Sequence, residues 1–267
     1  MIHTDIEVNK LKFELLAGNQ PEGVLKEEPF EIFDTMVIKF LSKLSKKLLC
    51  KNLNIEEYRD FKGFGFWVRE SNLINMRDSR KDINCRVGRG VSLHIAPSNI
   101  STNSLYTLAF GLLSGCPSII RLSNKNIDEL RSIMQLINKI LESSEFSKLS
   151  NKISFINYEH DRTISNYFSS LVDSRILWGG DETIKIFKSF KTASHCLDIV
   201  FPNKVSSSLI SSEWLISSDG NEIANKADLF ARDIGLFSQM ACSSPQSLIV
   251  LKDQKLSSRK ELLDFFK

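Results

Sequence analysis

Hydrophobic residues between positions 91 and 200 alternate between short apolar runs and longer stretches with helical periodicity. The short runs, bounded by turn residues, predict strands at residues 91–96, 118–122, 152–157, 175–178 and 196–200. Between them, apolar residues recur every three or four positions, which predicts helices at residues 102–114, 127–141, 161–171 and 181–190. This alternation predicts an α/β fold with a Rossmann-type, doubly wound parallel sheet and helices on both faces.

The segment before this region predicts helix over most of residues 1 to 60. Apolar residues recur at spacings of three and four between Phe30 and Leu49, and the lysines between them are typical of a solvated helix face. Residues 61–68 differ, because aromatic residues and glycines alternate there, which predicts a strand or a tight turn-strand. We expect these aromatic side chains to make an interior or oligomer contact rather than a base-stacking surface.

Beyond the alternating region, a strand is predicted at residues 205–210 and a helix at residues 221–236. The helix leads into a loop of small and turn-forming residues, Phe237 to Gln246, and a strand-like run follows at residues 247–251. This loop contains Cys242. Solvent can reach a thiol in such a loop, which makes Cys242 a candidate nucleophile.

The composition is that of an ordinary globular protein, with 42% hydrophobic and 25% charged residues among 267. The formal net charge of +3 is too balanced to indicate a nucleic-acid partner. The N-terminus lacks the basic and apolar regions of a signal peptide. Gly111, Gly115 and Pro117 break the weakly polar run at residues 105–120, so no transmembrane segment is expected.

The five cysteines lie far apart and form no CxxC pair, so neither a disulfide framework nor a zinc site is indicated, and no metal is expected. A reducing cytoplasm is the expected location. Four of the cysteines are predicted to be packing residues: Cys50, Cys85, Cys116 and Cys196. Among the histidines, His94 is expected to be structural, whereas His160 and His195 have no partner visible in the sequence.

Three predicted strands end in residues that suit a nucleotide. These ends are Pro97-Ser98-Asn99, Arg121-Leu122-Ser123-Asn124-Lys125 and Trp178-Gly179-Gly180-Asp181. They offer turn residues, cations and backbone amides at a helix start, at the edge where open α/β sheets bind ligands. No GxGxxG motif follows the first strand, so the usual dinucleotide fingerprint is absent.

Four stretches, in this order, carry a family resemblance: His94–Asn99, Gly111–Arg121, Trp178–Gly180 and Asp233–Gln246. They resemble the bacterial long-chain acyl-CoA (acyl-protein) reductases, the fatty-acid reductase subunit of bioluminescence systems, which belong to the aldehyde dehydrogenase superfamily. The resemblance runs from about residue 63 to residue 250, and its last stretch is the most specific.

The resemblance implies a domain organisation. An N-terminal helical segment at residues 1–85 would pack on a Rossmann-like cofactor domain at residues 86–236, and residues 237–267 would begin the catalytic domain. The superfamily's catalytic domain is long, whereas this chain ends at Lys267, soon after Cys242. The catalytic domain is therefore expected to be incomplete, and the chain to be an N-terminal portion.

The resemblance also implies roles for the strand ends. Cys242 is implied as the nucleophile and Asn99 as the side-chain amide donor to the oxyanion, with Pro97 and Ser98 in the same turn beside the cofactor. Trp178, Gly179 and Gly180 resemble the Phe-Thr-Gly-Ser turn that lies under the cofactor pyrophosphate.

The cofactor implied by the resemblance is NADPH. Arg121 to Lys125 stands where the superfamily has Lys-Pro-Ala-Glu beside the adenine ribose. The Glu that would accept a free ribose 2′-hydroxyl is missing, and Arg121, Ser123 and Lys125 suit a 2′-phosphate instead.

One departure from the superfamily concerns hydrolysis. When the sequences are aligned on Lys204, Val200 stands where oxidative members have the Glu that activates water. Without that base, water should attack an acyl-enzyme slowly, as a reductase requires. Asp198 lies two residues away and, on a strand, shares a face with Val200.

The implied activity is NADPH-dependent reduction of a long-chain fatty acyl-CoA or acyl-protein thioester to a fatty aldehyde through an acyl-cysteine intermediate. The implied partners are a long-chain acyl-CoA or an acylated synthetase, within an oligomer or a complex with acyl-protein synthetase and acyltransferase. Two alternatives remain open. One is an inactive cofactor-binding fragment or partner subunit that requires a C-terminal piece, and the other is an acyl-binding module without redox chemistry.

Overall fold

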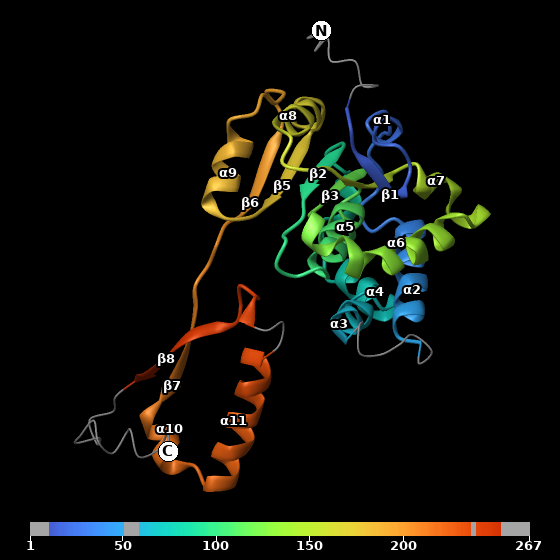
Figure 1. Cartoon of the computed structure of the whole chain (residues 1–267). Coiled ribbons are helices and arrows are strands. Elements are labelled where there is room, and N and C mark those ends of the chain that lie inside the picture. The colour runs from blue at the N-terminus through green and yellow to red at the C-terminus, as the bar shows by residue number, and fades with distance from the viewer. Residues whose placement is uncertain (1–10, 51–58, 236–238, 252–267) are drawn as a thin grey trace. The chain divides into compact units, whose positions relative to one another are not determined.

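The computed structural model describes residues 11–50, 59–235 and 239–251, and the chain divides into two compact units, Met1–Pro202 and Asn203–Lys267 (Figure 1). The first unit is built on a six-stranded sheet in the order β1-β4-β3-β2-β5-β6. Its strands are β1 (Glu14–Gly18), β2 (Ser92–Ile95), β3 (Ser118–Leu122), β4 (Ile153–Asn157), β5 (Ser174–Trp178) and β6 (Leu197–Phe201). Strands β2 to β6 run parallel, and β1 is antiparallel to β4. The predicted parallel α/β sheet is therefore confirmed.

The chain reverses its direction of travel across the sheet after β4. From β2 it moves outward through β3 to β4, and it then returns to the other side of β2 to form β5 and β6. His94 on β2 accordingly pairs with Ile120 on one side and Ile176 on the other. Open α/β sheets bind ligands at such a switch point, beyond the carboxyl ends of the strands. In this protein the switch point lies between β2 and β5.

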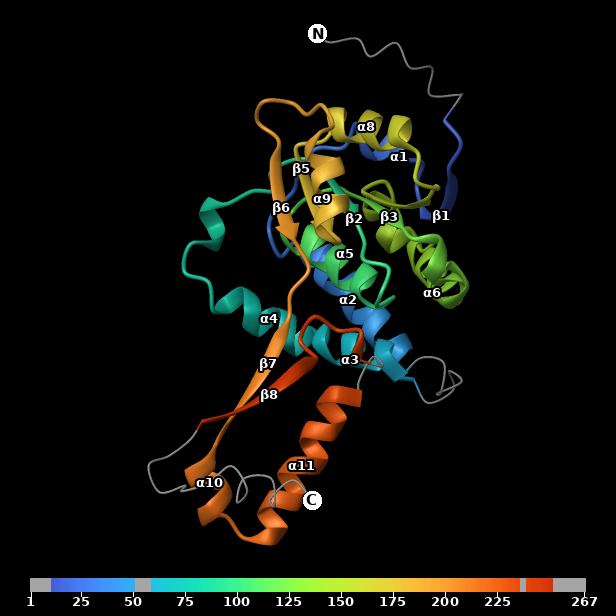
Figure 2. The same ribbon diagram turned by 60° about the vertical axis from the view of Figure 1, so that its left-hand side comes forward.

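Helices cover both faces of the sheet (Figure 2). One apolar core includes Ile120 and Phe155 with helices α2 (Thr35–Leu48), α3 (Arg59–Trp67), α4 (Glu70–Asp78), α5 (Asn103–Leu113), α6 (Ile127–Leu141) and α7 (Ser147–Ser150). A second core includes Leu93 and Ile119 with α1 (Pro21–Val24), α8 (Arg162–Leu171) and α9 (Asp181–Lys188). Short 3-10 helices lie at Ile83–Cys85, Asn124–Asn126 and Ser144–Phe146. Every residue of β2 and β3 is buried, as expected for parallel strands between two helical layers.

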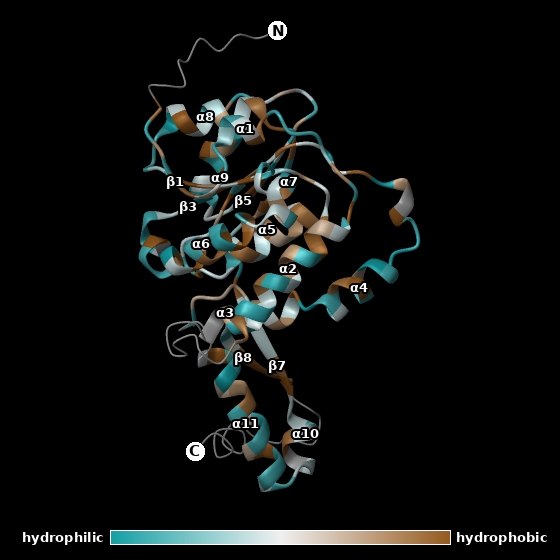
Figure 3. Ribbon diagram, turned by 90° about the vertical axis from the view of Figure 1, so that its right-hand side faces the viewer, coloured by the Kyte–Doolittle hydropathy of each residue, from teal (hydrophilic) through white to brown (hydrophobic). Residues whose placement is uncertain are grey.

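The second unit contains a two-stranded parallel sheet of β7 (Ser206–Ser211) and β8 (Pro245–Leu251), with α10 (Ser212–Ser217) and α11 (Gly220–Gly235) between the strands in sequence. Hydrophilic and hydrophobic residues alternate along α11 (Figure 3), and none of its residues is buried. The strands and the long helix predicted here are confirmed. Within the described part of the chain, no helix is long and apolar enough to cross a membrane. The predicted domain boundaries at residues 85/86 and 236/237 stay predictions.

The prediction of helix near the N-terminus is wrong for β1. Glu-Leu-Leu-Ala at residues 14–17 has high helix propensity, and the local sequence gives no sign of a partner strand. In the structure, Ala17 is buried and pairs with Phe155 on β4. Pairing with a distant strand therefore overrides local propensity. The helix predicted between residues 30 and 49 is confirmed as α2, whereas residues 1–10 and 51–58 lie outside the described residues.

The prediction of a strand at residues 61–68 is also wrong, because Arg59–Trp67 forms α3. Phe61, Phe64 and Val68 are buried and follow one another at helical spacing. The alternation of glycine and aromatic residues concealed this signal. The interior contact expected for the aromatic side chains is confirmed for Phe61 and Phe64, whereas Phe66 is exposed.

The predicted end of α5 at Gly115 is confirmed, and this glycine has a second purpose. Gly115 has a φ of +75°, and the N–H groups of Gly115 and Cys116 donate to the carbonyl oxygens of Leu112 and Gly111. This is the Schellman pattern of helix termination. A Cβ on Gly115 would lie 2.1 Å from the carbonyl oxygen of Phe30. Both the left-handed backbone and the close approach of a second backbone segment therefore require glycine.

We expect Gly115→Ala to lower the free energy of unfolding by about 2 kcal/mol or more, because backbone strain and a backbone clash act together. Gly63→Ala is the matched control, since Gly63 is exposed within α3 and a Cβ there would meet open space. That change should raise stability by about 0.5–1 kcal/mol. Urea unfolding followed by circular dichroism measures both. A Gly115→Ala chain as stable as the wild type would contradict this role.

Candidate functional site

Two of the predicted site turns follow adjacent strands at the same edge of the sheet. Pro97–Asn99 follows β2, and Gly179–Gly180 follows β5. Because β2 and β5 are parallel neighbours, both turns lie at the carboxyl edge, at the switch point. Ser98 and Asn99 are exposed and Pro97 is half-buried. The structure therefore brings these two parts of the predicted site to one place.

The turn after β5 leads directly into α9, which begins at Asp181. Gly180 is the N-cap residue, so no side chain caps the amides of the first turn. Uncapped amides at a helix start attract anions. At the end of β5, the Trp178 ring stacks on that of Phe201, with ring centres 3.9 Å apart and an angle of 9° between the planes. The indole Nε1 of Trp178 is buried and has no hydrogen-bond partner among the described residues.

The three predicted cofactor residues at the end of β3 lie in different environments. Arg121 is buried, with Nη2 donating to the Tyr158 carbonyl oxygen at 3.0 Å and the guanidinium 5.2 Å from the centre of the Tyr158 ring. Burial lowers the pKa of Arg121 from its usual value. Ser123 is half-buried, and its hydroxyl accepts from the Lys125 N–H at 3.4 Å. Lys125 is exposed, so it is the cation of this segment that solvent reaches.

His94 is structural, as predicted. Its side chain is buried in the middle of β2, and Nδ1 lies 2.7 Å from Thr107 Oγ1 on α5. Burial lowers the pKa of His94 from 6.5 to about 3, so the ring is neutral near pH 7. A Cβ on Gly111 would lie 2.9 Å from the ring, so the imidazole fills the space between β2 and α5.

The acidic residue beside the missing general base is held in an ion pair. Asp198 and Val200 are half-buried on the same side of β6, as predicted. The carboxylate oxygens of Asp198 accept from Arg175 Nε and Nη2 on β5, each at 2.7 Å. A bidentate pair fixes a carboxylate in one orientation and occupies its lone pairs. Val200 itself has no group that could take a proton from water.

Cys242 belongs to the second unit. It lies in a turn between α11 and β8, as predicted, and its side chain is exposed. Its carbonyl oxygen accepts a hydrogen bond from Ser206 Oγ at 2.5 Å, which ties the turn to the start of β7. Residues 236–238, around the start of the predicted loop, lie outside the described residues.

The other four cysteines differ in burial. All five thiols are free, Cys116 is buried, and Cys196 is half-buried, with burial raising the pKa of its thiol. Cys50 and Cys85 are exposed, so the packing prediction is wrong for these two. Exposure alone therefore does not distinguish Cys242 from Cys50 and Cys85.

Sequence reasoning missed two polar clusters inside the sheet unit. One is the Arg175–Asp198 pair, and the other joins His195 Nε2 to Asp173 Oδ1 at 2.8 Å. Asp173 also accepts from the Val91 N–H at 2.7 Å, so it connects the starts of β2, β5 and β6. A usable signal existed for the first cluster, because a charge within an apolar strand must find a partner when it is buried.

The fold is that of the aldehyde dehydrogenases. It matches an aldehyde dehydrogenase from Bacillus cereus in an NAD+ complex, with a TM-score of 0.60 over 91% of this chain and 51% of that one, at 13% identity. It also matches the NADP-dependent glyceraldehyde-3-phosphate dehydrogenase from Bacillus halodurans complexed with NADP, with a TM-score of 0.58 over 95% and 60% of the two chains, at 12% identity. At these identities the likeness shows the fold alone.

Within this class, the chain belongs to the LuxC acyl-CoA reductase family, whose model matches residues 69–263. It is 24% identical over 187 residues to long-chain acyl-protein thioester reductase 2 of Photobacterium leiognathi, covering 66% of this chain and 37% of that protein. It is 25% identical over 167 residues to the long-chain acyl-protein thioester reductase of Aliivibrio fischeri, covering 62% and 33%. The match thus spans about a third of the length of these relatives, and the family resemblance in the sequence is confirmed.

The buried neutral His94 makes stability depend on pH. The unfolded chain binds a proton at His94 near pH 6.5, whereas the folded chain does so only near pH 3. The free energy of unfolding is therefore unaffected by His94 protonation above pH 6.5. It falls below that pH, by up to about 1.4 kcal/mol per pH unit. We expect His94→Asn to reduce this slope in urea unfolding between pH 4.5 and 7.5. His160→Asn, at an exposed position, is the control, and an unchanged slope in His94→Asn would contradict the assignment.

Proposed function

We propose that this chain carries the cofactor-binding and acyl-accepting residues of an NADPH-dependent reductase that converts a long-chain acyl thioester to a fatty aldehyde. Membership of the LuxC acyl-CoA reductase family over residues 69–263 is the observation that carries the proposal. The relatives named long-chain acyl-protein thioester reductases support the substrate class. Structural neighbours in complex with NAD+ or NADP support a nicotinamide cofactor.

In the proposed reaction, the Cys242 thiolate attacks the carbonyl carbon of the thioester. The bond to the sulfur of CoA or of the carrier then breaks, and the acyl group stays on Cys242. A bound NADPH would supply the hydride that reduces the acyl carbonyl carbon. The bond to the Cys242 sulfur breaks next, which releases the aldehyde and restores the thiolate. Asn99 donates its amide N–H to the oxyanion, a role worth about 10²–10³ in rate.

The carboxyl edge of the sheet suits the pyrophosphate of the cofactor. The start of α9 after Gly179–Gly180 has no side-chain cap, and backbone amides at a helix start bind phosphate groups. Trp178 lies immediately before this turn, and the exposed Ser98 lies with Pro97 in the turn after the neighbouring strand. These residues would border the bound cofactor.

The ribose of the adenosine half would lie beside the end of β3. Lys125 is the exposed cation there, and the Ser123 hydroxyl precedes it by two residues, which together suit a 2′-phosphate. Arg121 is buried against Tyr158, so it would not contact the 2′-phosphate directly. Its proposed role is to add positive charge below this edge of the sheet.

The proposed enzyme must keep its acyl group away from water until hydride arrives. Val200 stands at the position of the hydrolytic base and is apolar, and the carboxylate of Asp198 is engaged by Arg175. A carboxylate that must first leave a buried ion pair is a poor general base. Both features favour reduction of the acyl-enzyme over its hydrolysis.

The proposed substrate donor is a long-chain acyl-CoA or an acylated synthetase, in the cytoplasm and within a larger fatty-acid reductase assembly. A second candidate function is a cofactor-binding portion that is inactive without further polypeptide. The match to 37% and 33% of the two relatives favours this candidate. In that case the residues above keep their roles, and activity requires the additional segment.

We expect a stable acyl adduct on the folded chain after incubation with a long-chain acyl-CoA, measured as intact mass. Cys242→Ala should abolish the adduct, because its thiol forms the proposed thioester. Cys85→Ala should leave the adduct in place, since Cys85 is an exposed cysteine outside the proposed site. NADPH should remove the adduct and release aldehyde.

An adduct that survives Cys242→Ala would contradict Cys242 as the nucleophile. A Cys242 adduct that NADPH does not discharge would favour an acyl-binding module without redox chemistry. No adduct on the folded wild-type chain would favour the portion that needs further polypeptide, and the assay would then be repeated with that segment supplied.

We expect Lys125→Ala to raise the Kd for NADPH about tenfold, because the exposed cation would lose its contact with the 2′-phosphate. The Kd for NADH should change less than twofold, since NADH lacks that phosphate. Lys139→Ala, at an exposed lysine of α6, is the control and should change neither value. Isothermal titration calorimetry measures all of these values. Equal losses for NADPH and NADH would contradict recognition of the 2′-phosphate by Lys125.

A further inference from the structure

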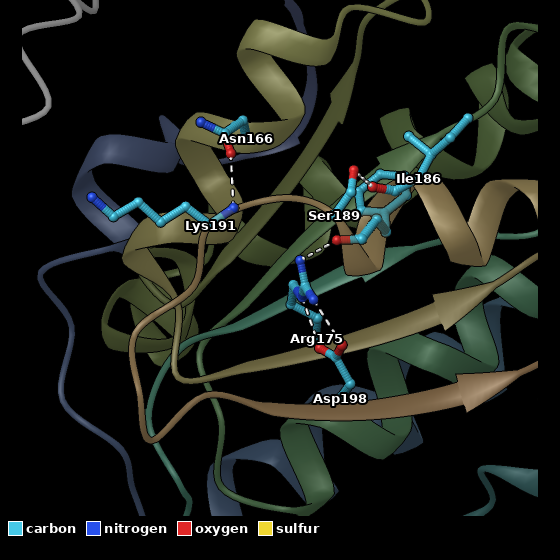
Figure 4. A network of polar contacts seen from close by, with 7 residues as sticks. Asn166, Arg175, Ile186, Ser189, Lys191 and Asp198 are labelled. Carbon is cyan, nitrogen blue, oxygen red and sulfur yellow. Dashed lines mark hydrogen bonds and ion pairs between the residues drawn. The ribbon is translucent and has the colours of Figure 1, made fainter.

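A buried arginine joins three elements of the sheet unit. The Arg175 side chain is 3% exposed and stands opposite Asp198 in the pairing of β5 with β6. Two of its nitrogens donate to the Asp198 carboxylate, and Nη1 donates to the carbonyl oxygen of Phe187 at 2.7 Å (Figure 4). Phe187 lies in the last turn of α9. One guanidinium therefore links β5, β6 and the C-terminal end of α9.

Two apolar side chains anchor α9. The helix is eight residues long, and its buried side chains are Ile184 and Phe187. A helix of this length is unstable in isolation, so its position depends on tertiary contacts. The carbonyl groups of its last turn carry partial negative charge, which makes a buried guanidinium a strong partner for them.

A long backbone hydrogen bond ties the turn before α9 to the sheet, from the Gly179 N–H to the Phe201 carbonyl oxygen on β6 at 3.3 Å. Gly179 and Gly180 connect α9 to β5, and glycine restricts backbone direction less than any other residue. The chain beyond the helix is held at the surface, where the Lys191 N–H donates to Asn166 Oδ1 on α8 at 3.0 Å (Figure 4). The buried contact from Arg175 ties the last turn of α9 directly to β5 and β6 through a charged group.

We propose that the Arg175–Asp198 pair is a positioning device for the cofactor. It holds the far end of α9 against β5 and β6, and so fixes the direction in which the amides after Gly179–Gly180 point. Those amides are the proposed partners of the NADPH pyrophosphate, so the inference rests on the proposed function. Arg175 does not contact the cofactor itself.

The test compares two ligands that differ in the pyrophosphate. NADPH carries it, whereas adenosine 2′-monophosphate carries the 2′-phosphate and adenine without it. In the double variant Arg175→Met/Asp198→Leu, apolar side chains replace the buried pair, a change that often preserves stability but here removes the link to Phe187. We expect its Kd for NADPH to rise about tenfold while its Kd for adenosine 2′-monophosphate stays within about twofold of wild type.

Two further variants keep the test decisive. Arg175→Lys retains the charge but cannot donate to both Asp198 and Phe187 in the fork geometry, so it should show the same selective loss if the double variant does not fold. Arg162→Lys is the matched control, because Arg162 makes a 3.5 Å hydrogen bond to Ser189 near the same helix end at the exposed surface. It should bind both ligands as the wild type does.

The outcomes separate this inference from the proposed function. Wild-type NADPH affinity in a folded Arg175 variant would overturn the inference alone. Equal losses of affinity for the two ligands would overturn it as well, because the pair would then stabilise the sheet as a whole rather than position α9. A wild-type chain that binds no NADPH would overturn the cofactor proposal and this inference with it.

Discussion

The pairing of β2 with β3 on one side and with β5 on the other is the constraint on which the rest of the structure depends. It places the carboxyl ends of five parallel strands at one edge of the sheet, and it creates the switch point there. Because β2 and β3 are then buried on both faces, helices must cover both faces, and the crossover helices do so. The candidate cofactor edge follows from this order of strands, without a glycine-rich dinucleotide motif.

The same burial limits which polar groups the sheet can hold. His94 meets this limit by staying neutral and bonding to Thr107, and Arg121 by facing the Tyr158 carbonyl group and ring. Arg175 meets it by pairing with Asp198. These three side chains each have a partner on a different element, so their polar contacts also fix how helices and strands lie together.

The alternating pattern between residues 91 and 200 was enough to predict the sheet, because its strands are short apolar runs and its helices have a clear apolar face. β1 and α3 were not predicted, for opposite reasons. The sequence of β1 favours helix, and a distant strand decides its state. The helical spacing of Phe61, Phe64 and Val68 was present but was hidden by glycines between them.

The candidate site, like the fold, could be predicted from the sequence only in part. The turns after β2 and β5 could be located from the sequence, because the end of a predicted strand is visible there. The burial of Arg121 could not, since it depends on Tyr158, which follows a different strand. Exposure of Cys242 was expected, but the exposure of Cys50 and Cys85 was not. Which exposed thiol reacts is therefore argued from the family stretch around Cys242 rather than from its surroundings.

The Arg175–Asp198 pair connects the fold to the proposed chemistry in two ways. The proposed reductase would need no free base at this part of β6, and the Asp198 carboxylate there is bound by Arg175, with Val200 two residues further along the strand. The same guanidinium reaches the last turn of α9, whose first turn is the proposed phosphate site. In the proposed enzyme, Arg175 would thus have two effects. It would keep the Asp198 carboxylate from activating water, and it would orient the helix that binds the cofactor. Both effects favour hydride transfer over hydrolysis.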